Sequence, residues 1–153
     1  MRVEVLHTPG HTSDSVCLHL PDDGPAGSVL TGDTILGHGT TMLDHPDGTL
    51  ADYLGSLDRL EALGRARVLP AHGPALGSVA EAAARYRAHR QDRLEQVRAL
   101  LASRPEAERD AVTAEELAEQ IYPGLEGVVR RVSVQTMAAH LRFLRENPAP
   151  QPS

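Results

Sequence analysis

Apolar and polar positions follow two different periods along the chain. In the first part they alternate within short runs rich in β-branched residues, a pattern typical of strands. Four runs fit this pattern: RVEVL, SVCLHL, SVLTGD and the start of ARVLPAHG. The last two pass directly into polar loops that contain glycine. We therefore predict four short strands.

Helical periodicity appears from residue 50. The apolar residues Leu50, Tyr53, Leu54, Leu57 and Leu60 fall on one face of a helix. Predicted helices also begin with a Ser or Thr followed three residues later by an acidic residue, the pattern of a capping box. The pairs are Thr49 with Asp52, Ser78 with Glu81, and Thr113 with Glu116. Later helices are expected at about 78–103, over TAEELAEQIY, and over VSVQTMAAHLRFLREN.

The order of these elements indicates two parts in an α/β (α+β) chain. Residues 1–77 combine the strands with one helix, and residues 78–147 contain helices alone. Residues 148–153, PAPQPS, have the composition of a disordered tail. The division at residue 77 is soft, because the helix that begins near Ser78 fits either part. A length of 153 residues suits one domain with a small appendage.

Composition narrows the class of protein. Hydrophobic residues make up 41% of the chain, but there is one Phe and no Trp, so the core must be aliphatic. A single cysteine excludes an intramolecular disulfide. No apolar run is long enough to span a membrane, and the N-terminus lacks the regions of a signal peptide. We expect a cytoplasmic protein that does not enter membranes, with the Arg-, Ala- and Gly-rich composition of a bacterial one.

Three polar loops share one arrangement that carries candidate chemistry. His11 in TPGHT, Asp33 in LTGDT and His72 in LPAHGP each lie just beyond a strand-like run, beside a glycine. Loops at strand ends hold functional groups well, because the strands fix their position. Imidazole and carboxylate are ligands of divalent metals such as zinc. The three residues therefore predict a metal site with room for a water molecule.

The same three motifs, HTPGHT, TGDTILGHGTT and LPAHGP, resemble the third, fourth and fifth metal-site motifs of the metallo-β-lactamase superfamily. Within it, the chain looks most like a lactamase-like endoribonuclease subgroup. YRAHRQDRLEQV resembles the linking helix of that subgroup, and TAEELAEQIYPG and SVQTMAAHLRFLRE resemble its small winged-helix-like domain. The resemblance extends to about residue 147.

The resemblance implies a fold, a site and a reaction. The fold is the C-terminal half of an αββα sandwich (1–77) followed by a winged-helix-like helical domain (78–147). His11 would ligate the first of two zinc ions, Asp33 would bridge both as the catalytic carboxylate, and His72 would ligate the second. Iron or manganese would also suit these ligands. A metal-activated water would attack an ester, a thioester or a phosphodiester, single-stranded RNA included.

Further residues follow from the same resemblance. Thr40 and Thr41 lie in the glycine-rich stretch near the substrate cleft of such enzymes, and His89 would help to shape that cleft. For His89 a solvated helix surface is the simpler interpretation, since Arg85, His89 and Arg93 share one helix face. Cys17 is expected to be a small buried hydrophobic residue, and His140 a structural one.

The main metal motif of the family, His-x-His-x-Asp-His, does not occur in this sequence. We therefore expect a fragment or a mis-started gene product of a full-length enzyme, with reduced or no activity alone. A short protein completed by a second chain and an inactive relative are the alternatives. A half-sandwich would expose a sheet face, which favours self-association.

A different class of function is also open. The C-terminal helices carry Arg130, Arg131, Arg142 and Arg145, which would suit a non-catalytic nucleic-acid-binding or interaction module. However, the net charge of −6 comes entirely from residues 1–77, with 4 Arg against 10 Asp or Glu. Residues 78–153 hold 11 of each sign and lack the basic excess that phosphate binding usually needs. RNA as a substrate is therefore favoured over DNA as a regulatory target.

Overall fold

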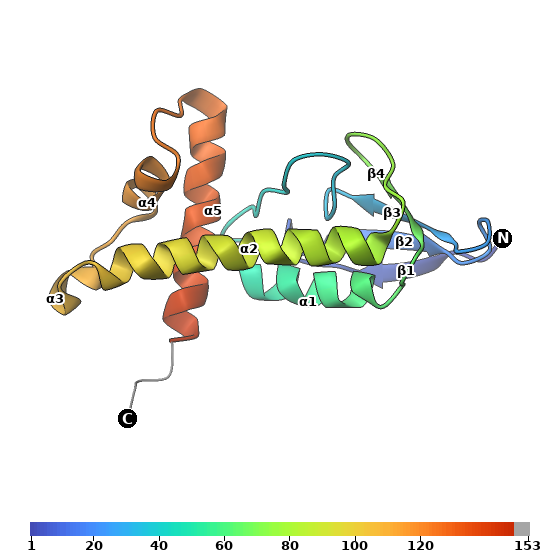
Figure 1. Cartoon of the computed structure of the whole chain (residues 1–153), viewed down its shortest axis with the longest axis horizontal. Coiled ribbons are helices and arrows are strands. Elements are labelled where there is room, and N and C mark those ends of the chain that lie inside the picture. Colours follow the sequence, from blue (N-terminus) through green and yellow to red (C-terminus); the bar gives the residue numbers. More distant parts are fainter. Residues whose placement is uncertain (149–153) are drawn as a thin grey trace.

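A computed structural model describes residues 1–148 and shows a mixed α/β fold built on one four-stranded sheet (Figure 1). The strands are β1 (Glu4–His7), β2 (Val16–Leu20), β3 (Ser28–Gly32) and β4 (Arg67–Pro70), in the spatial order β1-β2-β3-β4. β1, β2 and β3 pair antiparallel, whereas β3 and β4 are parallel. The parallel pair needs a crossover, which helix α1 (Leu50–Glu61) provides. All four predicted strands are present.

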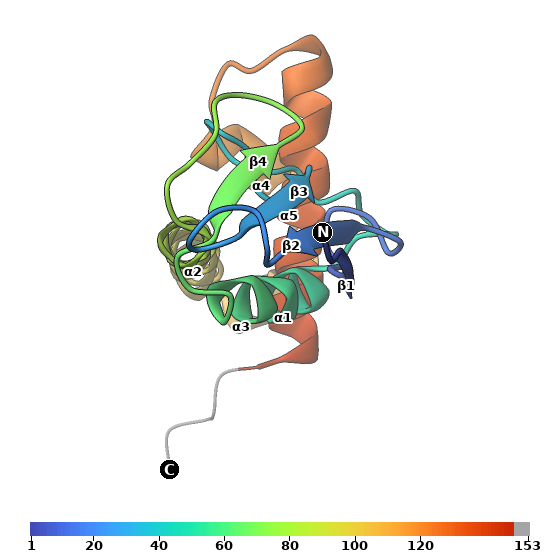
Figure 2. The same cartoon turned by 90° about the vertical axis from the view of Figure 1, so that its right-hand side faces the viewer.

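One face of the sheet is covered by α1 and by the long helix α2 (Val79–Ala102), as Figure 2 shows end-on. The inward-facing strand residues Cys17, Val29 and Val68 are completely buried against these helices. From α1, the periodic residues Leu50, Tyr53, Leu57 and Leu60 enter the same core. The core is aliphatic, as the composition predicts, and Cys17 lies within it as expected.

The opposite face of the sheet has no covering layer among the described residues. Val5, Leu18, Leu30 and Leu69 are register partners across all four strands and therefore form one apolar row. Val5 is 68% exposed and Leu30 is 39% exposed. An exposed apolar sheet face was predicted for the first part of the chain, and the structure shows one.

The predicted helix starts follow from local side-chain bonds. The hydroxyls of Thr49, Ser78 and Thr113 accept hydrogen bonds from the backbone N–H three residues later. At Thr113 the capping box is complete, because Glu116 also accepts from the Thr113 N–H. Each bond satisfies a backbone donor that the helix itself leaves unpaired.

Beyond β4 the regular elements of the described chain are all helices, apart from an isolated β-bridge at Leu76. α2 is followed by α3 (Glu106–Arg109), α4 (Ala114–Ile121) and α5 (Gly127–Glu146), and α5 crosses α2 (Figure 1). The likeness to a winged helix is therefore limited to helices, since no strand follows residue 70 within the described range. The boundary between 77 and 78 stays a prediction, because α2 contacts both α1 and α5. The predicted tail lies outside the described residues, apart from Pro148.

Helix α5 begins five residues earlier than its sequence pattern predicts. The periodic run starts at Val132, but the helix starts at Gly127. Val128 and Val129 are 63% and 60% exposed, so the first turn has apolar residues on its outer side. An apolar residue that faces solvent disturbs the periodicity from which a helix is recognised. None of the helices in residues 1–148 is both long and apolar enough to cross a bilayer.

Candidate metal centre and adjoining pocket

Asp33 and His72 come together at the carboxyl end of the parallel strand pair. β3 ends at Gly32 and β4 at Pro70, and the two positions are register partners. The Ala71 N–H donates to the Gly32 carbonyl at 3.1 Å, so the segments that follow β3 and β4 leave the sheet side by side. His72 Nε2 and Asp33 Oδ1 are 3.6 Å apart, with side chains 71% and 42% exposed. The two predicted ligands thus form an accessible imidazole–carboxylate pair.

A glycine allows the two loops to approach each other. The Gly37 N–H donates to the His72 carbonyl at 2.8 Å. A Cβ atom at Gly37 would overlap the backbone of Pro74, so a larger residue could not lie there. Gly73 has a φ of +86°, a conformation that favours glycine. The glycines beside His72 therefore fix the position of its loop.

His11 lies in a neighbouring loop and is oriented by the backbone. Its Nδ1 donates to the Met42 carbonyl at 2.8 Å, which leaves Nε2 as the nitrogen with a free lone pair. The His11 carbonyl accepts from the Asp44 N–H, so the two loops are joined twice. Gly10 packs so closely on Tyr53 that a Cβ atom there would overlap its backbone. The turn HTPGH thus holds an oriented imidazole against residues 42–44.

The donor set fits part of a metal site. Imidazole and carboxylate suit zinc, iron or manganese, and the orientation of His11 is that of a metal-binding histidine. In residues 1–148, however, no three His, Cys, Asp or Glu side chains converge as a ligand group. The structure brings Asp33 and His72 together but does not join His11 to them in such a group. The ligand roles of the three residues stay predictions.

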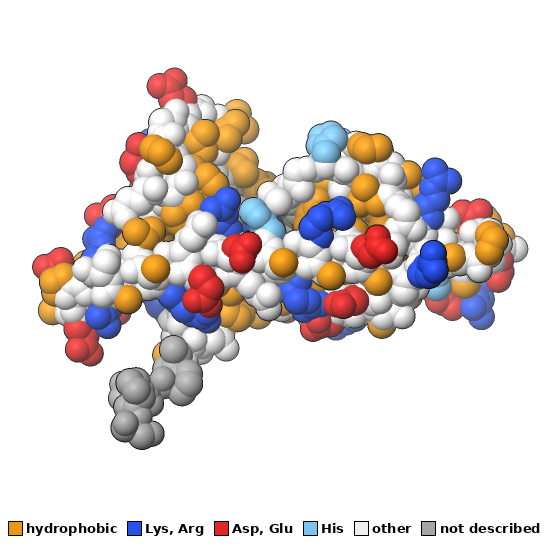
Figure 3. All heavy atoms as spheres, viewed as in Figure 1, with side chains coloured by type: hydrophobic (Ala, Val, Ile, Leu, Met, Phe, Trp, Pro, Cys, Tyr) orange, Lys and Arg blue, Asp and Glu red, His pale blue; other side chains and the backbone are white. Residues whose placement is uncertain are grey.

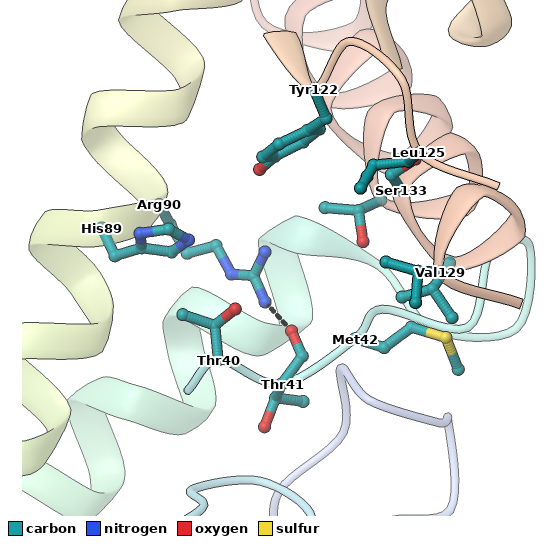
Figure 4. Close-up of a pocket in the computed structure, with 11 residues that line it drawn as sticks. Thr40, Thr41, Met42, His89, Arg90, Tyr122, Leu125, Val129 and Ser133 are labelled. Carbon is teal, nitrogen blue, oxygen red and sulfur yellow. Dashed lines mark hydrogen bonds between the residues drawn. The ribbon is translucent and has the colours of Figure 1, made fainter. Parts of the chain in front are cut away.

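A pocket adjoins this centre and contains all three predicted cleft residues. Thr40, Thr41 and His89 line a cavity of about 250 Å³ between α2, α5 and the loop after β3 (Figure 4). The hollow is visible in Figure 3 between the α4–α5 region and the region of the sheet, with apolar side chains on its walls. Thr41 also connects the pocket to the centre, because its hydroxyl donates to the Asp33 carbonyl at 2.5 Å. Burial, aided by the positive charge of Arg90, lowers the pKa of His89.

Arg90 also lines this pocket and was missed by sequence reasoning. Its side chain is almost completely buried, and it donates to the Thr41 carbonyl. Its guanidinium lies 5.2 Å from the centre of the Tyr53 ring. A signal was present, because Tyr86, Arg90 and Leu94 are spaced by four residues on the buried side of α2. An Arg within an apolar helical stripe is a candidate for a functional charge.

His140 and His7 lie outside the candidate metal centre. His140 is completely buried on α5, where its Nδ1 donates to the Thr136 carbonyl, as expected of a structural residue. Burial lowers the pKa of His140 to about 4. His7 is exposed, and its ring bonds the Ser13 carbonyl. Neither residue belongs to the Asp33–His72 pair.

The sequence and the fold are similar to those of known proteins. The sequence profile described as "Metallo-beta-lactamase superfamily" matches residues 1–72, which contain all three predicted ligands. A metallo-beta-lactamase family protein of Thermus thermophilus is 34% identical with a TM-score of 0.79, over 97% of this chain. The chain belongs to the metallo-β-lactamase superfamily.

Other superfamily members are similar at the same level. A beta-lactamase domain protein from Burkholderia ambifaria is 28% identical, with a TM-score of 0.79 over 94% of this chain. The beta-lactamase-like protein 2 homolog of Caenorhabditis elegans is 30% identical over 93% of this chain. An atrochrysone carboxyl ACP thioesterase of Passalora fulva is 32% identical over 78% of it.

This chain spans less than half the length of each of these proteins. It covers 44% of the Caenorhabditis elegans protein, 35% of the Passalora fulva thioesterase, and 45% and 42% of the two solved structures. Metal binding is a general property of the superfamily.

Proposed function

We propose that this chain contributes Asp33, His72 and His11 to the centre of a metal-dependent hydrolase, with zinc as the metal. The carrying observation is the Asp33–His72 pair, which the parallel strands β3 and β4 hold 3.6 Å apart. The oriented Nε2 of His11 in the adjoining loop supports the same proposal. A bound divalent metal supplies an activated water and polarises the bond to be cleaved.

The chain's own residues position this chemistry. The accessible Asp33 carboxylate and His72 imidazole offer one oxygen and one nitrogen ligand on the same side of the sheet. The Met42 carbonyl keeps the proton of His11 on Nδ1, so that Nε2 is free to bind. Thr41 holds the Asp33 backbone and fixes the carboxylate relative to the pocket. Substrate bound beside Thr40 and Thr41 would therefore lie next to the pair.

We further propose that the bond cleaved is an ester or a thioester. The pocket beside the pair has apolar walls from Met42, Leu125 and Val129, which suit an acyl group. A related protein is named as a thioesterase. Single-stranded RNA, which the likeness to the endoribonuclease subgroup suggests, is the second substrate to be tested.

Metal affinity tests the proposal directly. The purified chain is freed of metal with a chelator and titrated with zinc, iron(II) and manganese(II) by calorimetry. We expect zinc to bind, and Asp33→Asn or His72→Gln to weaken binding at least about tenfold, because each removes a ligand. His7→Gln is the matched control, since His7 is an exposed histidine four residues before His11. Absence of zinc binding, or equal weakening by His7→Gln, contradicts the proposal.

The substrate class is tested on the same preparations. The zinc-loaded chain is given an aryl ester, an acyl thioester and a labelled single-stranded RNA, and product release is followed. Release of thiol or phenol that is lost in Asp33→Asn supports ester or thioester hydrolysis. Cleavage of the RNA alone, lost in the same variant, replaces the acyl substrate with a phosphodiester.

A further inference from the structure

Arg90 is a buried positive charge with few partners. Its side chain is 1% exposed, and within residues 1–148 it donates to the Thr41 carbonyl and lies beside the Tyr53 side chain. Its Nε–H is buried and has no hydrogen-bond acceptor among the described residues. None of the ion pairs within residues 1–148 includes it. No carboxylate of the described part of the chain therefore neutralises the guanidinium.

This arrangement is costly unless an anion completes it. A charge removed from water is normally paired or fully hydrogen-bonded, because its desolvation costs several kcal/mol. The Tyr53 ring at 5.2 Å and one carbonyl compensate part of that cost. Burial accordingly lowers the pKa of the Arg90 guanidinium.

The pocket in front of Arg90 indicates what kind of anion fits. Figure 4 shows the guanidinium reaching from α2 towards the space enclosed by Tyr122, Ser133 and Met42. The walls combine apolar side chains from α5 and the preceding loop with the hydroxyls of Thr40 and Ser133, and none of the lining residues is acidic. A volume of about 250 Å³ is small for a pocket, so it suits a compact ligand.

We propose that this pocket binds a small organic carboxylate, whose charge is neutralised by Arg90 and whose hydrocarbon part lies against the apolar walls. One guanidinium matches the single charge of a carboxylate. Phosphate carries about −1.5 to −2 charges near neutral pH and would need further cations. His89, the other basic residue of the lining, is held towards its neutral form by burial and by Arg90.

Thr41 links the pocket to Asp33 of the Asp33–His72 pair. Thr41 accepts from Arg90 through its carbonyl and donates to Asp33 through its hydroxyl. The bound carboxylate would thus be a second acidic group of the acyl compound that is hydrolysed. This last assignment rests on the proposed function, whereas the binding of the carboxylate does not.

Binding is tested without metal and without turnover. The chelator-treated, ¹⁵N-labelled chain is titrated with 2-naphthoate, with its neutral counterpart 2-naphthamide, and with inorganic phosphate. The arginine Nε–H signals are followed by NMR, and the Arg90 signal is assigned by its loss in Arg90→Lys. We expect naphthoate to shift this signal saturably and to bind about 10 to 100 times more tightly than the amide, as for hydrogen bonds to charged groups.

Two exposed valines give a matched pair that does not depend on the folding of an Arg90 variant. Val129 lines the pocket, whereas its neighbour Val128 does not, and the two are similarly exposed. Val129→Trp should block the pocket and weaken naphthoate binding at least about tenfold, while Val128→Trp should leave it unchanged. Circular dichroism checks that both variants are folded.

Several results would overturn the carboxylate pocket. These are no saturable binding, equal affinity for naphthoate and naphthamide, or binding that neither moves the Arg90 signal nor responds to Val129→Trp. Displacement of naphthoate by an equal concentration of phosphate would also overturn it. Because zinc is absent throughout, failure here leaves the metal titration unaffected, and failure of that titration leaves carboxylate binding intact.

Discussion

The two faces of the sheet have similar residues but very different surroundings. Val68 points into the core and is completely buried, whereas its neighbour Leu69 points to the opposite side and is only partly covered. Both faces are apolar, as in sheets that are covered on both sides. The strands therefore have apolar residues on both faces, although the described helices cover only one of them. The outer face thus has the chemistry of an interface, and the inner face has that of a core.

The strongest test of this comparison places the same charge on each face. Val68→Asp should lower the free energy of unfolding by about 4 kcal/mol or more, because it creates a cavity and buries an unpaired carboxylate. Leu69→Asp should cost less than about 1 kcal/mol, since its carboxylate can reach water. Urea unfolding of both variants measures the difference, and equal losses would mean that the outer face is covered in solution.

A pair of histidines extends the comparison to pH. His140 is buried on helix α5, and His7 is exposed at the end of strand β1. The folded pKa of His140 is lowered to about 4, so the unfolded chain binds its proton first as the pH falls. His140 therefore costs the fold nothing above about pH 6.5 and up to about 3 kcal/mol at about pH 4.

The measurement is the free energy of unfolding between pH 7 and pH 4 in the wild type and two variants. His140→Gln should lose most of this pH dependence, whereas His7→Gln should retain it. If both variants keep the wild-type slope, protonation of His140 does not cause the pH dependence of the free energy of unfolding.

The smallest expected effect concerns association through the outer face. Val5→Lys should change the free energy of unfolding by no more than about 0.5 kcal/mol, because Val5 is exposed on the edge strand β1. It should nevertheless reduce concentration-dependent self-association, since a lysine within the exposed apolar row opposes burial of that face. Sedimentation velocity compares it with Val128→Lys, a similarly exposed valine on α5. A wild-type chain that stays monomeric, or equal effects of both lysines, would disprove association through the sheet.

The sequence predicts those parts of the molecule that depend on local pattern. The strands followed from alternation and the helix starts from caps such as Thr113 with Glu116, because both signals act within a few residues. The start of α5 was missed because Val128 and Val129 face outwards. Features of the site that depend on distant contacts could not be read in this way.

Asp33 and His72 illustrate what could be predicted of the site. Their positions directly after two strands indicated that the strands hold them in place, and the parallel pairing of β3 and β4 puts both at the same end of the sheet. The orientation of His11 depends on the Met42 carbonyl, 31 residues away, and no local pattern reports it. Arg90 was overlooked for a related reason, since an arginine on a helix is normally solvated and only the packing of α5 shows otherwise.

The unbroken course of α2 has a mechanical consequence. A helix of 24 residues is a rod about 36 Å long. One end rests on α1 beneath the sheet, and the other lies against α4 and α5. A rotation of these two regions against each other would have to bend or unwind the rod, at the cost of its backbone hydrogen bonds. The distance between these two regions is therefore fixed by a continuous helix and not by a hinge.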